Sequence, residues 1–150
     1  MPCNLYGPGD NYDPVNSHVL PGLIRRFHSA MISNDPQVMC WGTGSPQREF
    51  MFVDDLASAC VLLMEKYSGD EPVNIGSGTE VSIREASKLV AHAVGYVGNI
   101  VWNSDLPDGA PRRFMDSHKI FSMGWKPETG LSYGLRVAYE DFLKRQEALG

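Results

Sequence analysis

MPCNLYGPGDNYDPVNSHVLPGLIRRFH, residues 1–28, contains a short apolar segment, a loop and the start of an amphipathic helix. Residues 1–8 end in Gly-Pro, which predicts the end of a buried strand that runs into a loop. Gly, Asp, Asn and Pro dominate residues 9–16, as expected of that loop. A helix should follow, capped by Ser17 and tolerating Pro21 in its first turn. Apolar residues recur in it at helical spacing: Val19, Leu20, Leu23, Ile24, Phe27 and Met31.

Strands and helices are predicted to alternate along the rest of the chain, which indicates an α/β fold. The expected strands are residues 37–41, 48–53, 71–76 and 100–102. The expected helices are residues 56–67 after an Asp54 cap, 83–94 between a Ser82–Glu85 capping box and Gly95, 117–123, and 133–148. The helix over residues 56–67 is apolar nearly all round, so we expect it to be buried.

Composition narrows the class of protein. The chain has 150 residues, the size of one domain, and a formal net charge of −5, which argues against non-specific binding to nucleic acid or anionic membranes. Its three cysteines form no CxxC pair, so we expect neither a disulfide framework nor a metal site. No apolar run approaches the roughly 18 residues of a membrane span, and the N-terminus resembles no signal peptide. These features predict a cytoplasmic protein.

Two motifs of dinucleotide-dependent dehydrogenases do not occur in the sequence. A glycine-rich GxGxxG turn lets backbone N–H groups approach a pyrophosphate, but Gly42-Thr43-Gly44 and Gly76-Ser77-Gly78 are too short for that role. Short-chain dehydrogenases also need a Tyr four residues before a Lys, which lowers the pKa of the phenol. None of the six tyrosines has a Lys at that spacing. We therefore expect no catalytic Tyr-Lys pair within these residues.

Several motifs together resemble one known family. Residues 1–28 are similar to the segment that follows the Tyr-Lys helix in GDP-L-fucose synthases, of the extended short-chain dehydrogenase/reductase family. The usual form there is close to MPTNLYGP, a short loop and a Ser-His-Val-(Ile/Leu)-Pro helix. The similarity continues through Trp41-Gly42-Thr43-Gly44, Arg48-Glu49-Phe50, Val53-Asp54-Asp55-Leu56, Val73-Asn74-Ile75-Gly76, Ser82-Ile83-Arg84-Glu85 and Pro107-Asp108-Gly109-Ala110-Pro111-Arg112. It covers essentially the whole chain.

The resemblance implies a fold and an activity. Members of that family are about twice this length, and this chain matches their C-terminal half. Residues 1–150 would then be one substrate-binding region: the last strands of a Rossmann-type parallel sheet plus a small α/β domain. Family members epimerise GDP-4-keto-6-deoxymannose at two carbons and reduce its ketone with NADPH. The chain is expected to be inactive alone and to need the N-terminal NADP-binding half or a homo-oligomer partner.

The resemblance also implies residues for the reacting end of the substrate. His18 matches the family's catalytic acid, and its ordinary pKa near 6.5 suits proton return at neutral pH. The alternative interpretation is that His18 only caps or packs against the start of a helix. Pro2, Cys3, Asn4 and Leu5 match the strand end that, with His18, lines the nicotinamide side of NADP. The family's base is a Cys outside this chain, so we interpret Cys3 as a small buried apolar residue.

Basic and aromatic residues are expected at the nucleotide end. Arg26, Arg48 and Arg113 resemble residues that hold the GDP diphosphate, because guanidinium groups bind phosphate oxygens bidentately. Arg25 and Arg112 are adjacent competitors, and because neighbouring side chains point to different faces, only one residue of each pair should point at the ligand. Trp41 can lie against the base or ribose, although a core position is an alternative. Asn99 and Asp108 are weaker candidates. Asn99 would lie beside the nucleotide pocket, and Asp108 is chiefly a turn residue.

Two other functions remain open at this point. The chain could be a stand-alone nucleotide-sugar binding module, or a subunit that completes a separate polypeptide. It could also belong to another extended short-chain nucleotide-sugar epimerase or dehydratase. The base of the preferred nucleotide distinguishes the second alternative from a GDP-L-fucose synthase, because such an enzyme would bind a uridine or thymidine nucleotide more tightly than a guanosine nucleotide.

Overall fold

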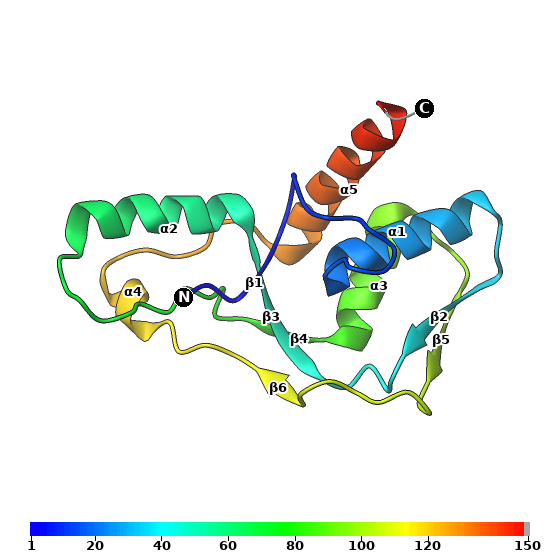
Figure 1. Cartoon of the computed structure of the whole chain (residues 1–150), viewed down its shortest axis with the longest axis horizontal. Helices are drawn as coiled ribbons and strands as arrows, with labels where there is room; N and C mark the ends of the chain where they lie inside the picture. The colour runs from blue at the N-terminus through cyan, green and yellow to red at the C-terminus, as the bar shows by residue number, and fades with distance from the viewer. Residues whose placement is uncertain (149–150) are drawn as a thin grey trace.

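The computed structural model describes residues 1–148 and has an α/β architecture, as the alternating pattern predicted. The helices of the described residues are α1 (Val19–Ile32), α2 (Val53–Lys66), α3 (Ile83–Val94), α4 (His118–Ser122) and α5 (Leu131–Glu147). The strands are β1 (Asn4–Tyr6), β2 (Gln37–Trp41), β3 (Gln47–Phe52), β4 (Glu80–Ser82), β5 (Asn99–Asn103) and β6 (Arg112–Arg113). Figure 1 shows α2 and α4 on one side of the molecule, and α1, α3 and the β2–β5 pair on the other.

The strands form two small sheets that are mostly parallel. β3 pairs in parallel with β1 and β6 and antiparallel with β4. β2 and β5 form a separate parallel pair, in which Gln37 lies opposite Asn99 and Trp41 opposite Asn103. Beside β1, Pro2 makes a parallel bridge to Ile75. The expected strand over residues 71–76 is therefore reduced to one bridge, and β4 and β6 were not predicted.

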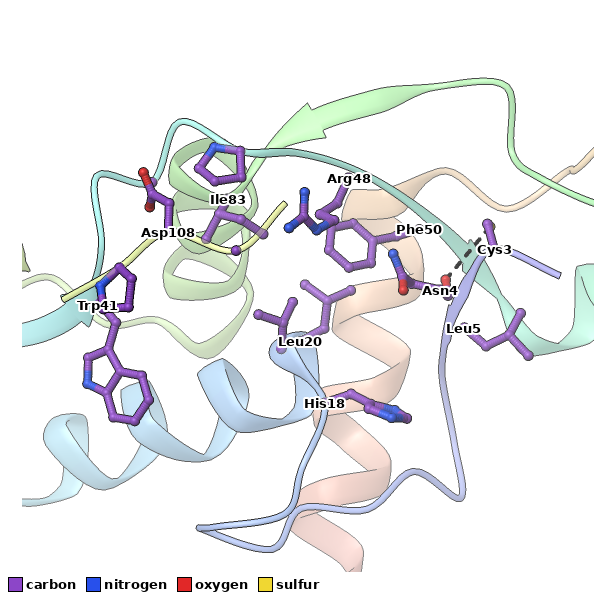
Figure 2. A pocket seen from close by; sticks show the side chains of 15 residues that line it. Cys3, Asn4, Leu5, His18, Leu20, Trp41, Arg48, Phe50, Ile83 and Asp108 are labelled. Atoms are coloured by element: carbon purple, nitrogen blue, oxygen red, sulfur yellow. Dashed lines mark hydrogen bonds between the residues drawn. The ribbon is translucent and has the colours of Figure 1, made fainter. Parts of the chain in front are cut away.

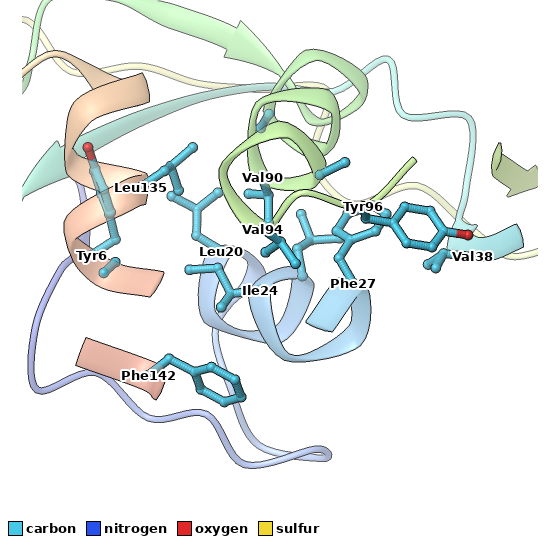
Figure 3. Packing of buried hydrophobic residues seen from close by; sticks show 14 of the residues in the cluster. Tyr6, Leu20, Ile24, Phe27, Val38, Val90, Val94, Tyr96, Leu135 and Phe142 are labelled. Atoms are coloured by element: carbon cyan, nitrogen blue, oxygen red, sulfur yellow. The ribbon is translucent and has the colours of Figure 1, made fainter. Parts of the chain in front are cut away.

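The larger hydrophobic core lies among α1, α3 and α5 (Figure 3). Phe27 of α1, Val90 of α3 and Leu135 of α5 are fully buried there. Phe50 and Phe52 of β3 join this core, whereas the intervening Met51 belongs to a smaller cluster under α2. Alternate residues of a strand point to opposite faces, so β3 separates the two clusters.

Local signals fixed the ends of α3 but not the starts of α1 and α2. Ser82 accepts a hydrogen bond from the Glu85 N–H at 3.0 Å, and Gly95 ends α3 with a φ of 83°, as predicted. The Ser17 and Asp54 caps were wrong: His18 and Phe52 occupy the cap positions, and neither makes a side-chain cap bond. In both helices the residue at the cap position has an extended backbone, so neither start is set by a side-chain cap.

The expectation that the second helix is buried was also wrong. Among the residues of α2, only Asp55 and Ala59 are buried. Val61 and Met64 are 55% and 85% exposed, because nothing in residues 1–148 covers the outer face of the helix. None of the helices in residues 1–148 combines the length and the apolar character needed to cross a membrane.

Candidate functional site

A cavity of about 560 Å³ lies where the end of β1, the start of α1 and the middle of β3 meet (Figure 2). It brings together six of the predicted site residues: Cys3, Asn4, Leu5, His18, Trp41 and Arg48. Figure 2 shows His18 and Asn4 toward one end of the cavity, Trp41 at the other, and Arg48 between them. Residues as far apart in the sequence as Cys3 and Gly109 thus border one space.

The end of β1 forms the wall beside His18. The Asn4 side chain donates a hydrogen bond to the Glu49 backbone carbonyl at 3.1 Å, which fixes its amide against β3. Burial and the nearby Glu49 carboxylate raise the pKa of the Cys3 thiol to about 11. A thiol with such a high pKa stays protonated at neutral pH, which agrees with interpreting Cys3 as a packing residue rather than a base.

His18 stands at the N-cap position of α1 with its side chain exposed to the cavity. Its imidazole makes no cap bond, so the capping alternative is not what the geometry supports. The loop before it is held from both sides: the Tyr12 hydroxyl donates to the Ala138 carbonyl of α5 at 2.9 Å, and Arg25 donates to the Tyr12 carbonyl at 2.9 Å. His18 is thereby presented from an anchored loop.

Arg48 and Arg113 form a pair of cations. They lie opposite each other in the parallel β3–β6 register, and Arg48 is half-buried. Burial and then the charge of Arg113 lower the pKa of Arg48. Among residues 1–148 neither guanidinium makes a salt bridge to a carboxylate. Arg113 does not line the cavity itself, but its charge adds to a site that suits an anion.

Trp41 and Arg26 extend the site toward a second hollow of about 640 Å³ between α1 and β2. Trp41 is 69% exposed and lines both hollows, so the core alternative for this residue was wrong. The Arg26 guanidinium lies 5.9 Å from the Trp41 ring and donates to the Met39 carbonyl at 3.1 Å. An exposed indole beside a guanidinium offers a flat face and a charge to a nucleotide.

Three predicted site residues line neither hollow: Pro2, Asn99 and Arg113. Pro2 is exposed in its bridge to Ile75. Asn99 begins β5 and pairs with Gln37, at the end of the strand pair away from Trp41. Arg112 forms a bidentate ion pair with Glu80 at 2.6 and 2.8 Å, and it does not line the cavity. Arg25 and Arg26 both line the second hollow, so alternation does not separate that pair.

One acidic residue near the site, Glu49, was not recognised from sequence, whereas Asp108 was expected chiefly as a turn residue. Glu49 is fully buried and accepts hydrogen bonds from the Gly78 N–H at 2.8 Å and the Met115 N–H at 3.1 Å. Asp108 lines the cavity and bonds to Thr43. Glutamate is rarely fully buried, so no sequence signal pointed to Glu49. Apolar Leu20, Phe50 and Ile83 complete the cavity, although their spacing indicated only core faces.

The arrangement suits a ligand with a reactive group at one end and an anionic group further along. His18 can exchange a proton at the β1 end, and the Arg48–Arg113 pair can bind phosphate oxygens. The exposed Trp41 ring can stack on a base or sugar.

Comparisons with known proteins agree with this geometry. Residues 1–76 match the NAD dependent epimerase/dehydratase family. The chain is 58% identical over 144 residues to probable GDP-L-fucose synthase 1 of Oryza sativa subsp. japonica, an alignment that covers 96% of this chain and 44% of that protein. It is 43% identical to the GDP-L-fucose synthase of Escherichia coli strain K12, covering 98% of this chain and 49% of that protein.

A solved structure shares the fold. The GDP-L-fucose synthetase of Naegleria fowleri bound to NADP superposes with a TM-score of 0.90 at 27% identity, covering 97% of this chain and 46% of that chain. This chain spans about half the length of the relatives that it matches. The resemblance to GDP-L-fucose synthases that the motifs predicted is confirmed, and the chain belongs to the NAD dependent epimerase/dehydratase family.

Proposed function

We propose that residues 1–150 are the substrate-binding region of an NADPH-dependent GDP-4-keto-6-deoxymannose 3,5-epimerase/4-reductase, which makes GDP-L-fucose. The observation that carries the proposal is the single cavity lined by the β1 end, His18, Arg48 and Trp41. Its length separates a proton-handling end from a cationic end, which matches a sugar joined to a nucleoside diphosphate. The 58% identity to a probable GDP-L-fucose synthase supports the choice of substrate.

NADP fits one end of this site. Cys3, Asn4, Leu5 and His18 would border its nicotinamide, since all four line the same end of the cavity and the Asn4 amide is held in place. The cofactor supplies a hydride when bound. The sequence contains no glycine-rich pyrophosphate turn, and the Gly78 N–H already binds the Glu49 carboxylate. We therefore expect weak NADP binding by this chain alone.

His18 would act as an acid that returns a proton to a carbon beside the ketone. Imidazole is the side chain that enzymes use most often as a general acid or base, which suits this role. In this proposal, His18 at the β1 end would lie near the sugar rather than near the diphosphate. The partner base, the Tyr-Lys pair and the cofactor cradle have no counterpart in this sequence, so we propose that the chain is inactive alone.

The first experiment measures binding of GDP and GDP-L-fucose by isothermal titration calorimetry. We expect both to bind, and Arg48→Ala to weaken binding about tenfold to a hundredfold, because it removes a charge-assisted hydrogen bond. Arg136→Ala is the matched control, since it removes an exposed guanidinium from α5, away from the cavity. Wild-type affinity that is unchanged in Arg48→Ala would contradict the proposal.

Two further measurements separate the alternatives. Tighter binding of UDP or dTDP than of GDP would favour another nucleotide-sugar epimerase or dehydratase. Turnover of the keto sugar by the purified chain without any added polypeptide would overturn the expectation of inactivity. GDP binding without turnover, even after the remainder of a related synthase is supplied, would favour a stand-alone binding module. A cytoplasmic location and the choice of oligomeric partner stay predictions.

A further inference from the structure

Residues 104–111 cross the rim of the cavity with few anchors. Near its ends, the segment is held by the Leu106 N–H to the Asn103 carbonyl at 3.4 Å and by the Gln47 N–H to the Pro111 carbonyl at 2.8 Å. Between those points, Pro107, Asp108 and Gly109 line the cavity although they are exposed. Within the described residues, only the Asp108 side chain hydrogen-bonds residues 107–110 to the rest of the protein.

Both oxygens of that carboxylate bind one residue. Thr43 donates its backbone N–H to Asp108 Oδ1 at 2.9 Å and its hydroxyl to Asp108 Oδ2 at 2.6 Å. These hydrogen bonds lower the pKa of Asp108, so the carboxylate is ionised at neutral pH. The approach is close enough to require Gly42, because a Cβ there would collide with Asp108 Oδ1 and the φ of 73° already disfavours other residues.

Thr43 is itself fixed from the opposite side. Arg84 of α3 donates a hydrogen bond to the Thr43 carbonyl, and its guanidinium lies 4.6 Å from the centre of the Trp102 ring. The Trp102 ring in turn packs against Gly44. The turn that carries Thr43 is therefore tied to α3 and β5, whereas residues 107–110 depend on Thr43.

The position of residues 107–109 affects Arg48. A Cβ placed on Gly109 would lie 3.1 Å from Arg48 Nη2, so this segment borders the guanidinium on the cavity side. Thr43 does not line the cavity, and it reaches the site only through Asp108. Releasing the segment would remove one wall and let Arg48 turn away.

We propose that Thr43 and Asp108 form a latch that holds residues 107–109 beside Arg48, and that Thr43 is a positioning residue for binding of a nucleoside diphosphate. This inference rests on the proposed function for the identity of the ligand. The contact itself joins residues 65 positions apart and exists without any ligand. In this proposal, the Asp108 carboxylate holds the loop in place and does not bind the ligand directly.

The experiment combines a double-mutant cycle with limited proteolysis of the unliganded chain. Thr43→Val keeps the side-chain shape and removes the hydroxyl, Asp108→Ala removes the acceptor, and Thr43→Ser restores the hydroxyl. We expect Thr43→Val to weaken GDP binding about tenfold, and the double variant to be no weaker than Asp108→Ala, because both changes break one contact. Thr43→Ser should bind nearly as well as wild type. Ser45→Ala is the matched control, since Ser45 contacts Thr43 but not residues 104–111.

Trypsin tests the latch without GDP. Arg112 and Arg113 are exposed and follow the latched segment directly, so cleavage there needs only local opening. Thr43→Val should be cut at these bonds several times faster than wild type, and Ser45→Ala at the wild-type rate. Additive losses of GDP affinity, or equal cleavage rates in Thr43→Val and wild type, would overturn the latch. If wild type bound no GDP, the proposed function would fail while the proteolysis still decided the latch.

Discussion

The core among α1, α3 and α5 and the cluster beneath α2 are built in different ways. The first is predominantly apolar and lies among three helices, with Phe27 fully buried. The second contains six buried apolar residues, and polar bonds fasten its surrounding loops. Glu49 binds the N–H groups of residues 78 and 115, and Asp55 binds those of Glu128 and Thr129 at 3.1 Å.

This difference separates what stabilises the chain from what shapes its site. Apolar burial scales with area and tolerates small shifts, whereas a buried carboxylate fixes particular N–H groups at particular distances. The candidate cavity lies at the border of the two regions, with Phe50 on the side of the larger core and Glu49 on the other. Substitutions in the two regions should therefore have effects of different size and kind.

The largest effect is expected from Phe27→Ala. Truncating a fully buried phenylalanine loses transfer free energy and leaves a cavity, which costs about 3–5 kcal/mol in unfolding free energy. Met64→Ala on the exposed face of α2 is the control and should change it by less than about 0.5 kcal/mol. Urea denaturation followed by circular dichroism measures both. Equal losses in the two variants would break the distinction between the regions.

Sequence periodicity predicted the larger region well, because its helices bury apolar residues that recur at helical spacing. Leu20, Leu23, Ile24 and Phe27 are buried on one face of α1 as their spacing predicted, whereas Val19 of the same pattern is 43% exposed. Ser82 and Gly95 mark the ends of α3 with local bonds. The strands β4 and β6 have three and two residues, and each exists only because β3 offers a partner. A pattern within one segment carries no information about such pairing.

The site was predicted in part, by motifs rather than by periodicity. His18, Trp41 and Arg48 do meet at one cavity, as their motifs implied. Asn99 lies at the end of the β2–β5 pair that is away from Trp41, so it does not line the cavity. The contact between Thr43 and Asp108 was not predicted, because the two residues are 65 positions apart and a local sequence pattern does not indicate such a contact. The buried Glu49 was missed because glutamate ordinarily indicates an exposed position.

A second, smaller effect is expected from Glu49→Gln. The amide keeps one acceptor but turns its NH2 group toward the other backbone N–H, which leaves a buried donor unsatisfied at a cost of about 1–3 kcal/mol. The same denaturation experiment measures it, with the exposed Glu65→Gln of α2 as control. A loss as small as that of the control would mean that the polar bonds do not hold the second region.

A third variant changes association rather than stability. Val61→Lys combined with Met64→Lys places two charges on the uncovered face of α2. If that apolar face promotes self-association of the chain, the double variant should be more monomeric at equal concentration, with an unfolding free energy within about 0.5 kcal/mol of wild type. Sedimentation velocity over a range of concentrations measures this. Identical profiles for the two proteins would show that another surface drives association.

The smallest effect concerns pH and tests how closed the larger region is at its edge. His28 of α1 lies half-buried against α5, with Nδ1 2.9 Å from the Tyr139 hydroxyl, and burial lowers its pKa. A folded-state pKa below the unfolded value near 6.5 means that the unfolded chain binds the proton more tightly. The contribution of His28 to stability is therefore complete above pH 6.5 and is lost as the pH falls through the lowered pKa.

We expect the unfolding free energy of wild type to fall more steeply between pH 7.5 and pH 5 than that of His28→Gln, which has no proton to gain. Tyr139→Phe keeps the burial of His28 and should keep the steep dependence, because desolvation rather than the hydroxyl lowers the pKa. Parallel curves for wild type and His28→Gln would mean that water reaches the imidazole freely. The contact between α1 and α5 would then be open at this edge, and the larger region would end at Phe142, whose ring lies 5.0 Å from that of His28.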